Sequence, residues 1–270
     1  MVNRVLKKVS VITPSYNQAA YIEQTIQSVL QQKGNFELEH LIIDGGSTDG
    51  TIDILKRYNG RIQWISEKDR GQSHAINKGF SMAKGEMIGW LNSDDLYEDG
   101  AIQKAVSIFT HNSNCQWVAG RCRIIDENGA EIRKTITRYK NKWLGRYSYD
   151  RLLVENFISQ PAGFFRKSFL DKIGHLDETL HYIMDYDLWL RMGAIENPVI
   201  INDSLASFRY YSNSKTGGEL NKSLDEVKRL CHYYAQGRRN ILFKNWVYRM
   251  KIRMGYSLLN SVNTRFRLSV

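Results

Sequence analysis

Cysteine, long apolar runs and repeats are scarce or missing in this chain of 270 residues. The three cysteines, Cys115, Cys122 and Cys231, are odd in number and lack the spacing of metal ligands. We therefore expect reduced thiols in a cytoplasmic protein, not disulfides or a zinc site. No apolar run approaches the ~18 residues of a spanning helix, and the apolar core of the first residues is too short for a signal peptide. With no repeat of solenoid period, the length suits one or two domains with a substantial core.

Acidic residues are missing after Glu226, although the chain has a formal net charge of +10. The tail that follows carries ten bases, and the body before it balances 28 bases against 28 acids. The bases of the tail are Lys228, Arg229, Arg238, Arg239, Lys244, Arg249, Lys251, Arg253, Arg265 and Arg267. The basic character of the protein therefore belongs to the tail and says little about any site in the body.

Short apolar runs alternate with helical spacing over the first 115 residues. The predicted strands, which are compact and rich in apolar or β-branched residues, are Val9–Thr13, His40–Asp44, Ile62–Ser66 and Glu86–Leu91. Helices are predicted over 22–30, with Asn17 as N-cap, and over 52–58, 74–83 and 101–109. This alternation predicts an α/β fold with a mostly parallel, doubly wound sheet.

The alternation loosens after residue 114. The segments "CQWVAGRCRIID" and "EIRKTIT" predict two strands joined as a hairpin through Glu127-Asn128-Gly129. Further on, Ala162–Phe165 predicts a strand and Asp185–Ala194 a helix, and "PVIIN" and "LASFRYY" predict two closing strands. We expect the body to end near Gly218.

Polar and small residues collect at the carboxyl ends of the first four predicted strands. Ligands of doubly wound sheets bind beyond those ends, so the convergence predicts a binding site. The residues concerned are Thr13-Pro14-Ser15, Asp44-Gly45-Gly46, Glu67 to Gly71, and Ser93-Asp94-Asp95.

Asp94 and Asp95 are adjacent carboxylates directly after a predicted buried strand. Such a pair is costly to bury unless a cation is present, and Mg²⁺ or Mn²⁺ often bridges carboxylates to substrate phosphates. The alternative is an acidic turn at the start of the next helix, for which Glu98 and Asp99 suffice. The three other polar strand ends favour the metal site.

Other polar residues have ordinary explanations beside the functional ones. The loop from Asp44 to Gly50 lacks both the EF-hand and the dinucleotide-binding spacing. It is either a flexible connection or a segment in which Asp44 meets a base or ribose and the glycines allow close approach. Lys78 is either a surface residue or a diphosphate contact. Asp185 and Asp187 are either acids that favour a helix N-terminus or part of a catalytic site.

Six segments resemble, in this order, the family 2 glycosyltransferases, which have the nucleotide-diphospho-sugar transferase fold called GT-A. They are "VITPSYNQAAYIEQTIQSVLQQ", "EHLIIDGGSTDGTIDIL", "SEKDRGQSHAINKGF", "GEMIGWLNSDDLY", "ISQPAGFFRKSFLDKIGHLDETLHYIMDYDLWLRM" and "LASFRYYSNSKT". The resemblance implies a GT-A domain over residues 1–218. Its Rossmann-like nucleotide-sugar-binding half would span 1–115, and its acceptor half with the catalytic base 116–218. A basic helical C-terminal extension over 219–270 would follow.

The resemblance also implies roles for the strand ends. The residues it implies for the nucleotide sugar are Thr13, Pro14, Ser15, Tyr16, Asn17, Asp44, Gly45, Asp69, Lys78 and Asp94. Asp44 would contact the base, which is uracil in the better-known members, and Asp94 would face the ribose. Asp95, the last acid of a DxD-like motif, would ligate Mg²⁺ or Mn²⁺ on the diphosphate.

Asp185 matches the family's catalytic-base position, although Met184 replaces the glutamate that usually precedes it. A second departure follows Arg209, where Tyr210 and Tyr211 stand and many relatives carry a histidine two residues past the arginine. The implied activity is inverting transfer of a sugar from a UDP-sugar to an acceptor hydroxyl. The acceptor is expected to be a lipid-linked saccharide in bacterial surface-polysaccharide synthesis.

Two other functions remain open on the residues alone. A nucleotidyltransferase that makes nucleotide sugars would be expected to carry a glycine-rich, basic phosphate loop near the first strand, where this chain has "TPSYNQ". A binding module for nucleotides or carbohydrates without catalysis would have no need of Asp185.

The basic tail has two interpretations. It is either a helix packed on the body with solvated bases, or an interfacial helix attracted to anionic lipid. The second would hold a cytoplasmic enzyme at the inner face of the membrane beside its acceptor. Segregation on the helical wheel is imperfect, because Arg249 and Arg253 fall near the side of Leu242 and Trp246. Nothing in the tail resembles a nucleic-acid recognition motif, so nucleic acid is not expected as a partner.

Overall fold

The computed structural model describes residues 8–211 and 220–267, with side chains up to 255. The first seven residues, where the absence of a signal peptide was predicted, lie outside the described residues, as does Gly218, the predicted end of the body.

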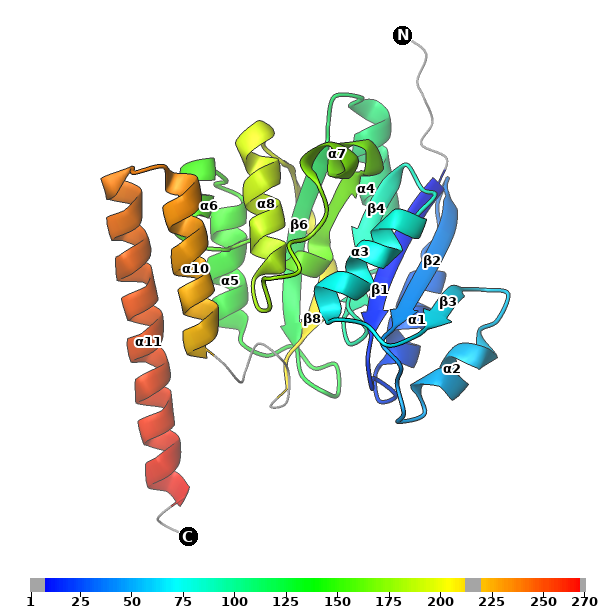
Figure 1. Cartoon of the computed structure of the whole chain (residues 1–270), viewed down its shortest axis with the longest axis horizontal. Coiled ribbons are helices and arrows are strands. Elements are labelled where there is room, and N and C mark those ends of the chain that lie inside the picture. Colours follow the sequence, from blue (N-terminus) through cyan, green and yellow to red (C-terminus); the bar gives the residue numbers. More distant parts are fainter. Residues whose placement is uncertain (1–7, 212–219, 268–270) are drawn as a thin grey trace.

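One eight-stranded sheet runs through the body in the order β3-β2-β1-β4-β7-β6-β8-β5 (Figure 1). The strands are β1 (Lys8–Ser15), β2 (Glu37–Asp44), β3 (Gln63–Ser66), β4 (Met87–Trp90), β5 (Leu96–Tyr97), β6 (Trp117–Ile125), β7 (Gly163–Arg166) and β8 (Val199–Arg209). Strands β1 to β4 pair in parallel, as the sequence predicts. Strand β7 is antiparallel to both β4 and β6, so the second half of the sheet is mixed.

The helices cover the faces of the sheet and form one end of the molecule (Figure 1). They are α1 (Ile22–Leu30), α2 (Thr51–Arg57), α3 (Gln72–Met82), α4 (Ala101–His111), α5 (Lys134–Leu144), α6 (Tyr149–Val154), α7 (Lys167–Ile173), α8 (Met184–Ile195), α10 (Leu220–Ala235) and α11 (Arg239–Arg267), with a 3₁₀ turn, η1, at Gln160–Ala162.

Helix α1 shows how the apolar spacing sets an element and where a local prediction was wrong. Ile22, Ile26 and Val29 recur at helical spacing and are buried against the sheet. The N-cap is Tyr21 and not Asn17. Asn17 lies in the left-handed region at φ 51° and uses its Oδ1 to accept the backbone N–H of Thr48, so it belongs to the loop before the helix.

The predicted hairpin after Asp126 does not form. Strand β8 pairs with one edge of β6 as far as Ile125, whereas β7 pairs with only Trp117–Ala119 on the other edge. The chain does not continue along that edge, because Arg133 adopts φ 51° and α5 begins directly after it. The segment "EIRKTIT" makes a single bridge, Glu131 with Ile125, and then enters α5. The two predicted closing strands form one strand, β8, because Asn202 and Asp203 produce a bulge where a turn was expected.

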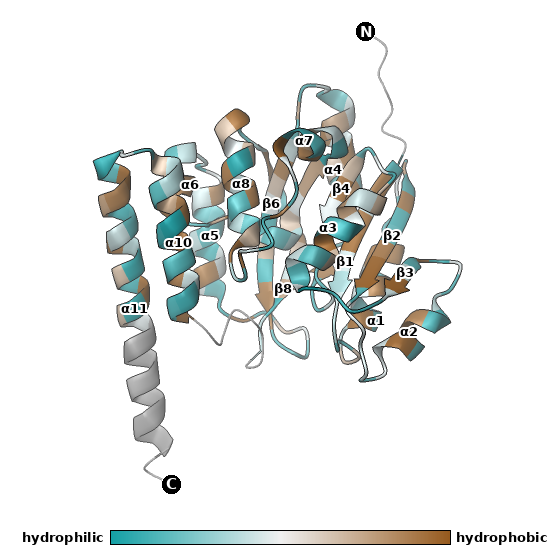
Figure 2. Cartoon of the chain, viewed as in Figure 1, coloured by the Kyte–Doolittle hydropathy of each residue, from teal (hydrophilic) through white to brown (hydrophobic). Residues whose placement is uncertain are grey.

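The first part of the tail belongs to the main core. Val227, Leu230 and Cys231 of α10 are buried in the same cluster as the parallel stacked rings of Trp117 and Trp189. Helices α10 and α11 lie side by side with α6 at one end of the molecule (Figure 1), and the hydropathy colouring shows hydrophilic and hydrophobic residues mixed along the described part of α11 (Figure 2). All three cysteines are free and buried. Within the described ranges, no helix combines the length and the hydrophobicity needed to cross a bilayer.

Candidate active site

The carboxyl ends of β1, β2 and β3 bring Tyr16, Gly45 and Asp69 together. A Cβ added to Gly45 would lie 2.6 Å from Asp69 Oδ2 and 3.4 Å from the ring of Tyr16. The missing side chain of Gly45 therefore makes room for the close approach of the other two. Tyr16 is 61% exposed, so its ring face is open for stacking. An exposed ring beside a carboxylate suits a planar, hydrogen-bonding ligand such as a nucleotide base.

Hydrogen bonds connect the loops after β1 and β2 beside the cluster of Tyr16, Gly45 and Asp69. The backbone N–H of Asn17 donates to Ser47 Oγ at 2.7 Å, and the N–H of Thr48 donates to Asn17 Oδ1 at 2.9 Å. Asn17 is exposed, so it borders the cluster of Tyr16, Gly45 and Asp69 and also joins the two loops beside it.

Asp44, which directly precedes Gly45, is fully buried. Its carboxylate accepts the backbone N–H groups of Gly46 and Ser47 at 3.0 and 2.8 Å. It also accepts the hydroxyls of Ser47 and Ser66, at 2.5 and 2.7 Å. Protein donors thus engage both oxygens, and Asp44 fixes the shape of the loop that carries Gly45.

Most of the segment Thr13–Asn17 is buried and lies out of reach of a ligand at the surface. Thr13, Pro14 and Ser15 are buried, and only Tyr16 and Asn17 are exposed. Thr13 Oγ1 lies 3.0 Å from His40 Nε2, and burial lowers the pKa of His40 to about 3, so this histidine is a neutral core residue. Lys78, on α3, forms an ion pair with Glu67 in the loop after β3.

Asp94 and Asp95 lie at the end of β4, in different environments. Asp95 has no exposed surface. Its Oδ1 accepts the backbone N–H of Arg209 at 2.9 Å, and its Oδ2 has only a long contact, 3.4 Å, with Asn92 Nδ2. Asp94 is half-buried, and its Oδ2 accepts the hydroxyl of Tyr211 at 3.0 Å. Tyr211 therefore contacts Asp94 directly.

The positive charge of Arg209 lies near this pair and lowers the pKa of both carboxyls, but its guanidinium is turned to neutral oxygens. It donates to the backbone carbonyls of Asp94, Asp126 and Glu127 and to Gln24 Oε1, at 2.8 to 3.0 Å. Burial raises the pKa of Asp94, and burial followed by the charge of Asp94 raises the pKa of Asp95 well above its usual value. Two adjacent carboxylates beside one cation remain unfavourable, and a further cation arriving from outside would relieve their repulsion.

The donor set fits a hard divalent cation that arrives with its own ligands. Mg²⁺ and Mn²⁺ prefer oxygen, and one or two carboxylates with substrate phosphates are a common arrangement. Asp95 Oδ2 and the half-buried carboxylate of Asp94 supply such oxygens. Over residues 8–211 and the described part of the tail, no three His, Cys, Asp or Glu side chains gather as a complete metal site. The remaining ligands would therefore come from outside these side chains, as phosphate oxygens and water.

Asp185 is the second residue of α8 and is half-buried. Burial raises its pKa, and the positive charge of Lys140 on α5 acts in the opposite direction. Asn156 Nδ2 donates to Asp185 Oδ2 at 3.2 Å, which orients the carboxylate. Met184 is 5% exposed and packs in the core, so an apolar side chain occupies the place of the usual glutamate. A carboxylate with a raised pKa and an orienting partner suits a general base.

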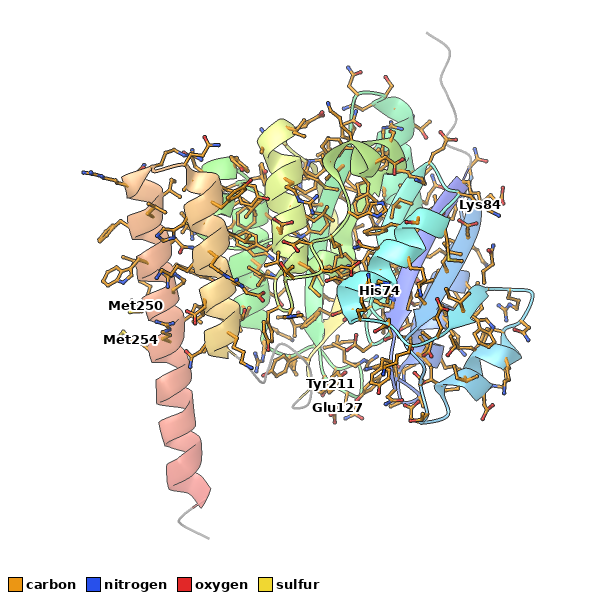
Figure 3. All side chains as sticks on the ribbon, viewed as in Figure 1. His74, Lys84, Glu127, Tyr211, Met250 and Met254 are labelled. Carbon is orange, nitrogen blue, oxygen red and sulfur yellow. The ribbon has the colours of Figure 1, made fainter. Side chains whose placement is uncertain are left out.

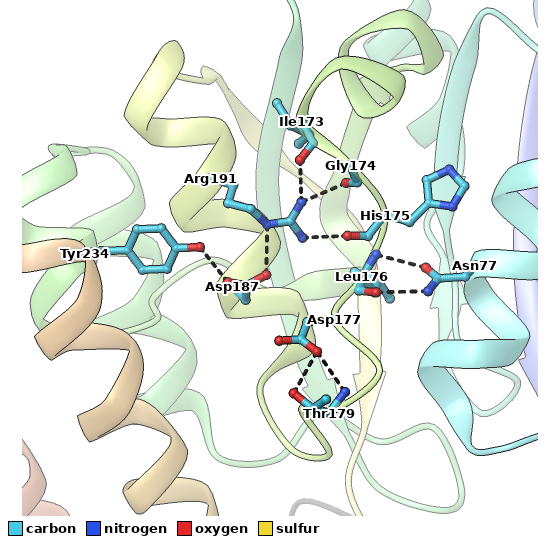
Figure 4. A network of polar contacts seen from close by, with 10 residues as sticks. All are labelled: Asn77, Ile173, Gly174, His175, Leu176, Asp177, Thr179, Asp187, Arg191 and Tyr234. Carbon is cyan, nitrogen blue, oxygen red and sulfur yellow. Dashed lines mark hydrogen bonds and ion pairs between the residues drawn. The ribbon is translucent and has the colours of Figure 1, made fainter.

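The first turns of α8 are tied to the preceding loop and to α10 (Figure 4). Arg191 donates to Asp187 Oδ2 at 2.9 Å and to the carbonyls of Ile173, Gly174 and His175, at 2.7 to 2.9 Å. Asp187 Oδ1 accepts the hydroxyl of Tyr234, on α10, at 2.7 Å. The helix that carries Asp185 is therefore fixed from two sides.

Glu226, also on α10, holds the other end of the same loop. Its buried carboxylate accepts the backbone N–H groups of His181 and Tyr182 at 3.1 and 3.0 Å, directly before the start of α8. On the opposite side, Asn77 exchanges two hydrogen bonds of 2.9 Å with the backbone of Leu176. Sequence reasoning missed Lys140, Glu226 and Tyr234. The only sequence signal was that Glu226 is the last acid before the basic tail.

A comparison with protein families matches residues 10–174 to the model described as glycosyl transferase family 2. This covers well over half of the chain. The chain belongs to the family 2 glycosyltransferases. The enzyme class predicted from the sequence is thereby confirmed, and the nucleotidyltransferase and the binding module are set aside.

Curated relatives agree with this membership. The glycosyltransferase is 30% identical over 230 residues to an uncharacterized glycosyltransferase of Rickettsia typhi, covering 82% of this chain and 70% of that one. It is 29% identical over 199 residues to the PGL/p-HBAD biosynthesis glycosyltransferase of Mycobacterium bovis, covering 71% of each.

Solved structures share the fold of this glycosyltransferase. TarS of S. aureus, residues 1–349 with UDP-GlcNAc, superposes with a TM-score of 0.65 at 18% identity, over 85% of this chain and 67% of that one. The mannosyltransferase PcManGT of Pyrobaculum calidifontis, in complex with GDP-Man and Mn²⁺, superposes with a TM-score of 0.62 at 16% identity, over 97% and 81%. The predicted GT-A fold is confirmed.

Proposed function

We propose that this glycosyltransferase moves a sugar from a UDP-sugar to an acceptor hydroxyl and inverts the anomeric configuration. The observation that carries this proposal is the presence of two distinct kinds of carboxylate: an adjacent pair, Asp94 and Asp95, that Arg209 only partly neutralises, and a single oriented carboxylate, Asp185. In this proposal residues 1–115 bind the donor, 116–218 bind the acceptor and carry the base, and 219–270 form the C-terminal extension. The UDP-GlcNAc and GDP-Man in the TarS and PcManGT structures support a nucleotide sugar as the donor class.

We assign the binding of the donor's base to the cluster of Tyr16, Gly45 and Asp69. The ring of Tyr16 would stack on the base, and the carboxylate of Asp69 would accept a hydrogen bond from its edge. Asn17 would border the site. Thr13, Pro14 and Ser15 would form its floor through their backbone. Asp44 would hold the loop beneath the base, and its direct contact with the base stays a prediction.

The diphosphate would lie between the loop of Lys78 and the carboxylates. Asp94 would face the ribose, held in place by Tyr211. Asp95, fixed through Oδ1 by the Arg209 backbone, would offer Oδ2 to Mg²⁺ or Mn²⁺. A divalent cation bound there would neutralise charge on the departing nucleoside diphosphate. Lys78, released from Glu67, would add a positive charge on the other side.

Asp185 would act as the general base. Its carboxylate, oriented by Asn156, would take the proton of the acceptor hydroxyl as the oxygen attacks the anomeric carbon from the face opposite the leaving group. Attack from that face inverts the configuration. The raised pKa of Asp185 favours proton acceptance, and general-base catalysis of this kind contributes on the order of 10²–10⁴-fold.

Release of nucleoside diphosphate from a panel of sugar donors tests the proposal, because slow donor hydrolysis needs no known acceptor. We expect release of UDP from at least one UDP-sugar with Mn²⁺, and its loss after chelation. An Asp95→Ala variant is the matched negative control. Release from GDP-sugars alone would overturn the choice of uridine. Products with retained configuration would overturn the assignment of Asp185 as base to an inverting reaction.

We also propose that the acceptor is a lipid-linked saccharide at the cytoplasmic face of an anionic membrane, as in surface-polysaccharide synthesis. The free cysteines and the basic tail support this location. Transfer of a radiolabelled sugar to an organic-extractable pool in isolated membranes tests it. Label that stays entirely in the aqueous phase would contradict it.

A further inference from the structure

Helix α11 has an inner face that packs on the body. Ile241, Asn245 and Arg249 are buried there. Asn245 Nδ2 donates to the carbonyl of Val154 at 2.9 Å, and Arg249 Nε donates to Asn245 Oδ1 at 2.9 Å. The sequence placed Arg249 near the same side of the helix as Trp246, but the structure assigns this arginine to the inner face. The poor segregation on the helical wheel therefore comes from a base that is inside.

The outer face of α11 carries an uncovered apolar stripe. Phe243, Trp246 and Met254 are 63%, 50% and 66% exposed, and Met250 is partly exposed between them. The rings of Phe243 and Trp246 stack at 5.9 Å. The spacings of three, four and four residues keep the four side chains on one side of the helix. Figure 3 shows Met250 and Met254 on the side of α11 away from the body.

Bases flank the stripe, and the tail has no acidic residue to balance their charge. Lys244 and Lys251 are exposed, and at about 100° per residue they lie on the flank of the helix between the stripe and the inner face. The chain has no acid between residue 227 and its end. A surface that complements this face must therefore be apolar beneath and negatively charged above.

We propose that the outer face of α11, defined by Phe243, Trp246, Met250 and Met254 with Lys244 and Lys251, binds an anionic membrane surface. An amphipathic helix with aromatic and apolar residues on one side and bases beside them lies in the plane of the lipid–water interface. Pairing of α11 with a second copy of the chain is disfavoured, because it would bring the bases of both tails together without any acid of the tails between them. The proposal builds on the lipid-linked acceptor proposed above, but vesicle binding itself is measured without donor or acceptor.

Vesicle co-sedimentation of the full chain tests the proposal, with phosphatidylcholine vesicles that contain or lack phosphatidylglycerol. We expect binding to the anionic vesicles and little binding to the zwitterionic ones. A Phe243→Ser, Trp246→Ser, Met254→Ser variant should lose about tenfold or more in partitioning, since burial of apolar side chains drives interfacial binding. Lys244→Gln with Lys251→Gln should weaken binding by roughly fivefold per base and remove most of its salt dependence.

Ile195→Ser is the matched control, because Ile195 is an equally exposed apolar residue, at 53%, that lies on α8. It should bind vesicles like the wild type. Circular dichroism and UDP-sugar hydrolysis in solution check that each variant is folded and active, so a loss of vesicle binding with hydrolysis intact isolates the membrane face from the proposed function.

Two outcomes would overturn the proposal. One is equal sedimentation of the wild type and the serine variant with anionic vesicles. The other is absence of vesicle binding by a wild type that light scattering shows to be a dimer and that the serine variant converts to a monomer. In that case a second copy covers the stripe.

Discussion

The two groups of carboxylates in the site differ in how they are completed. Burial raises the pKa of Asp94, Asp95 and Asp185 alike. The charge of Arg209 lowers the pKa of both acids of the pair, but its guanidinium donates to neutral oxygens, and Asp95 Oδ2 has a contact of only 3.4 Å with Asn92. Asp185, in contrast, has the charge of Lys140 nearby and the amide of Asn156 at 3.2 Å. The protein thus supplies the polar partners of Asp185 by itself. The negative charge of Asp94 and Asp95 would be fully neutralised only when a cation binds. Donor binding and chemistry should therefore be separable by mutation.

The largest separation is expected at Asp185. Asp185→Asn keeps the size and the contact region of the side chain but cannot accept the proton, so turnover should fall on the order of 10²–10⁴-fold. Binding of UDP with Mn²⁺, measured by calorimetry, should stay close to that of the wild type. Turnover within about tenfold of the wild type would remove Asp185 from the role of base.

The reverse separation is expected at Asp95. Asp95→Ala removes a carboxylate oxygen from the proposed metal site, and metal affinity should fall by about 100-fold, the upper end of what even outer-shell partners cost. Calorimetry of UDP with and without Mn²⁺ should lose its metal-dependent part. A variant that still binds UDP more tightly with Mn²⁺ than without would show that Asp95 is not a ligand.

A smaller effect, again on turnover alone, is expected at Glu226. Glu226→Ala leaves two backbone N–H groups of the loop before Asp185 without their acceptor, a cost of roughly 1–3 kcal/mol for each buried group. Because the loop leads into α8, we expect kcat to fall by about tenfold, with UDP affinity unchanged and a lower melting temperature.

Two further variants decide whether this effect comes from positioning. Glu226→Gln keeps an acceptor oxygen and should restore part of the turnover. Asp225→Ala is the matched control, because Asp225 is exposed and contacts the side chain of Arg253 at 3.4 Å. Equal losses of kcat and UDP affinity in Glu226→Ala would argue for a general loss of folding.

The smallest effect is expected in the pH dependence. A buried carboxylate with a raised pKa works as a base only above that pKa, so the acidic limb of the wild-type kcat profile should lie above the usual range of aspartate. Lys140→Met removes a charge that lowers the pKa of Asp185, so the limb should move to still higher pH. Lys142→Met, at a position of the same helix, should leave the limb in place. A shift to lower pH in Lys140→Met would contradict the proposed pairing.

The sequence was informative where local pattern and general topology decide the structure. Parallel strands end at one edge, so the residues after β1 to β4 could be assigned to one site from their order in the sequence. It failed where distant segments decide. The patterns of "PVIIN" and "LASFRYY" do not reveal that both segments pair with β6 as one strand, and Glu226 meets His181 across 45 residues of chain. The burial of Asp44 and Asp95 likewise depends on neighbours from other elements.

The hydrogen bonds from α10 to the loop before Asp185 have a consequence for the order in which parts of the protein fold during synthesis. A nascent chain that has emerged only as far as β8 already contains every described strand of the sheet, including the ends that carry Tyr16, Gly45 and Asp69. The carboxylate of Glu226 and the hydroxyl of Tyr234 follow later, and the loop before Asp185 is not fully held until they arrive. If Asp185 is the base as proposed, its surroundings are therefore the last part of the site to be completed, after the sheet that is proposed to bind the donor.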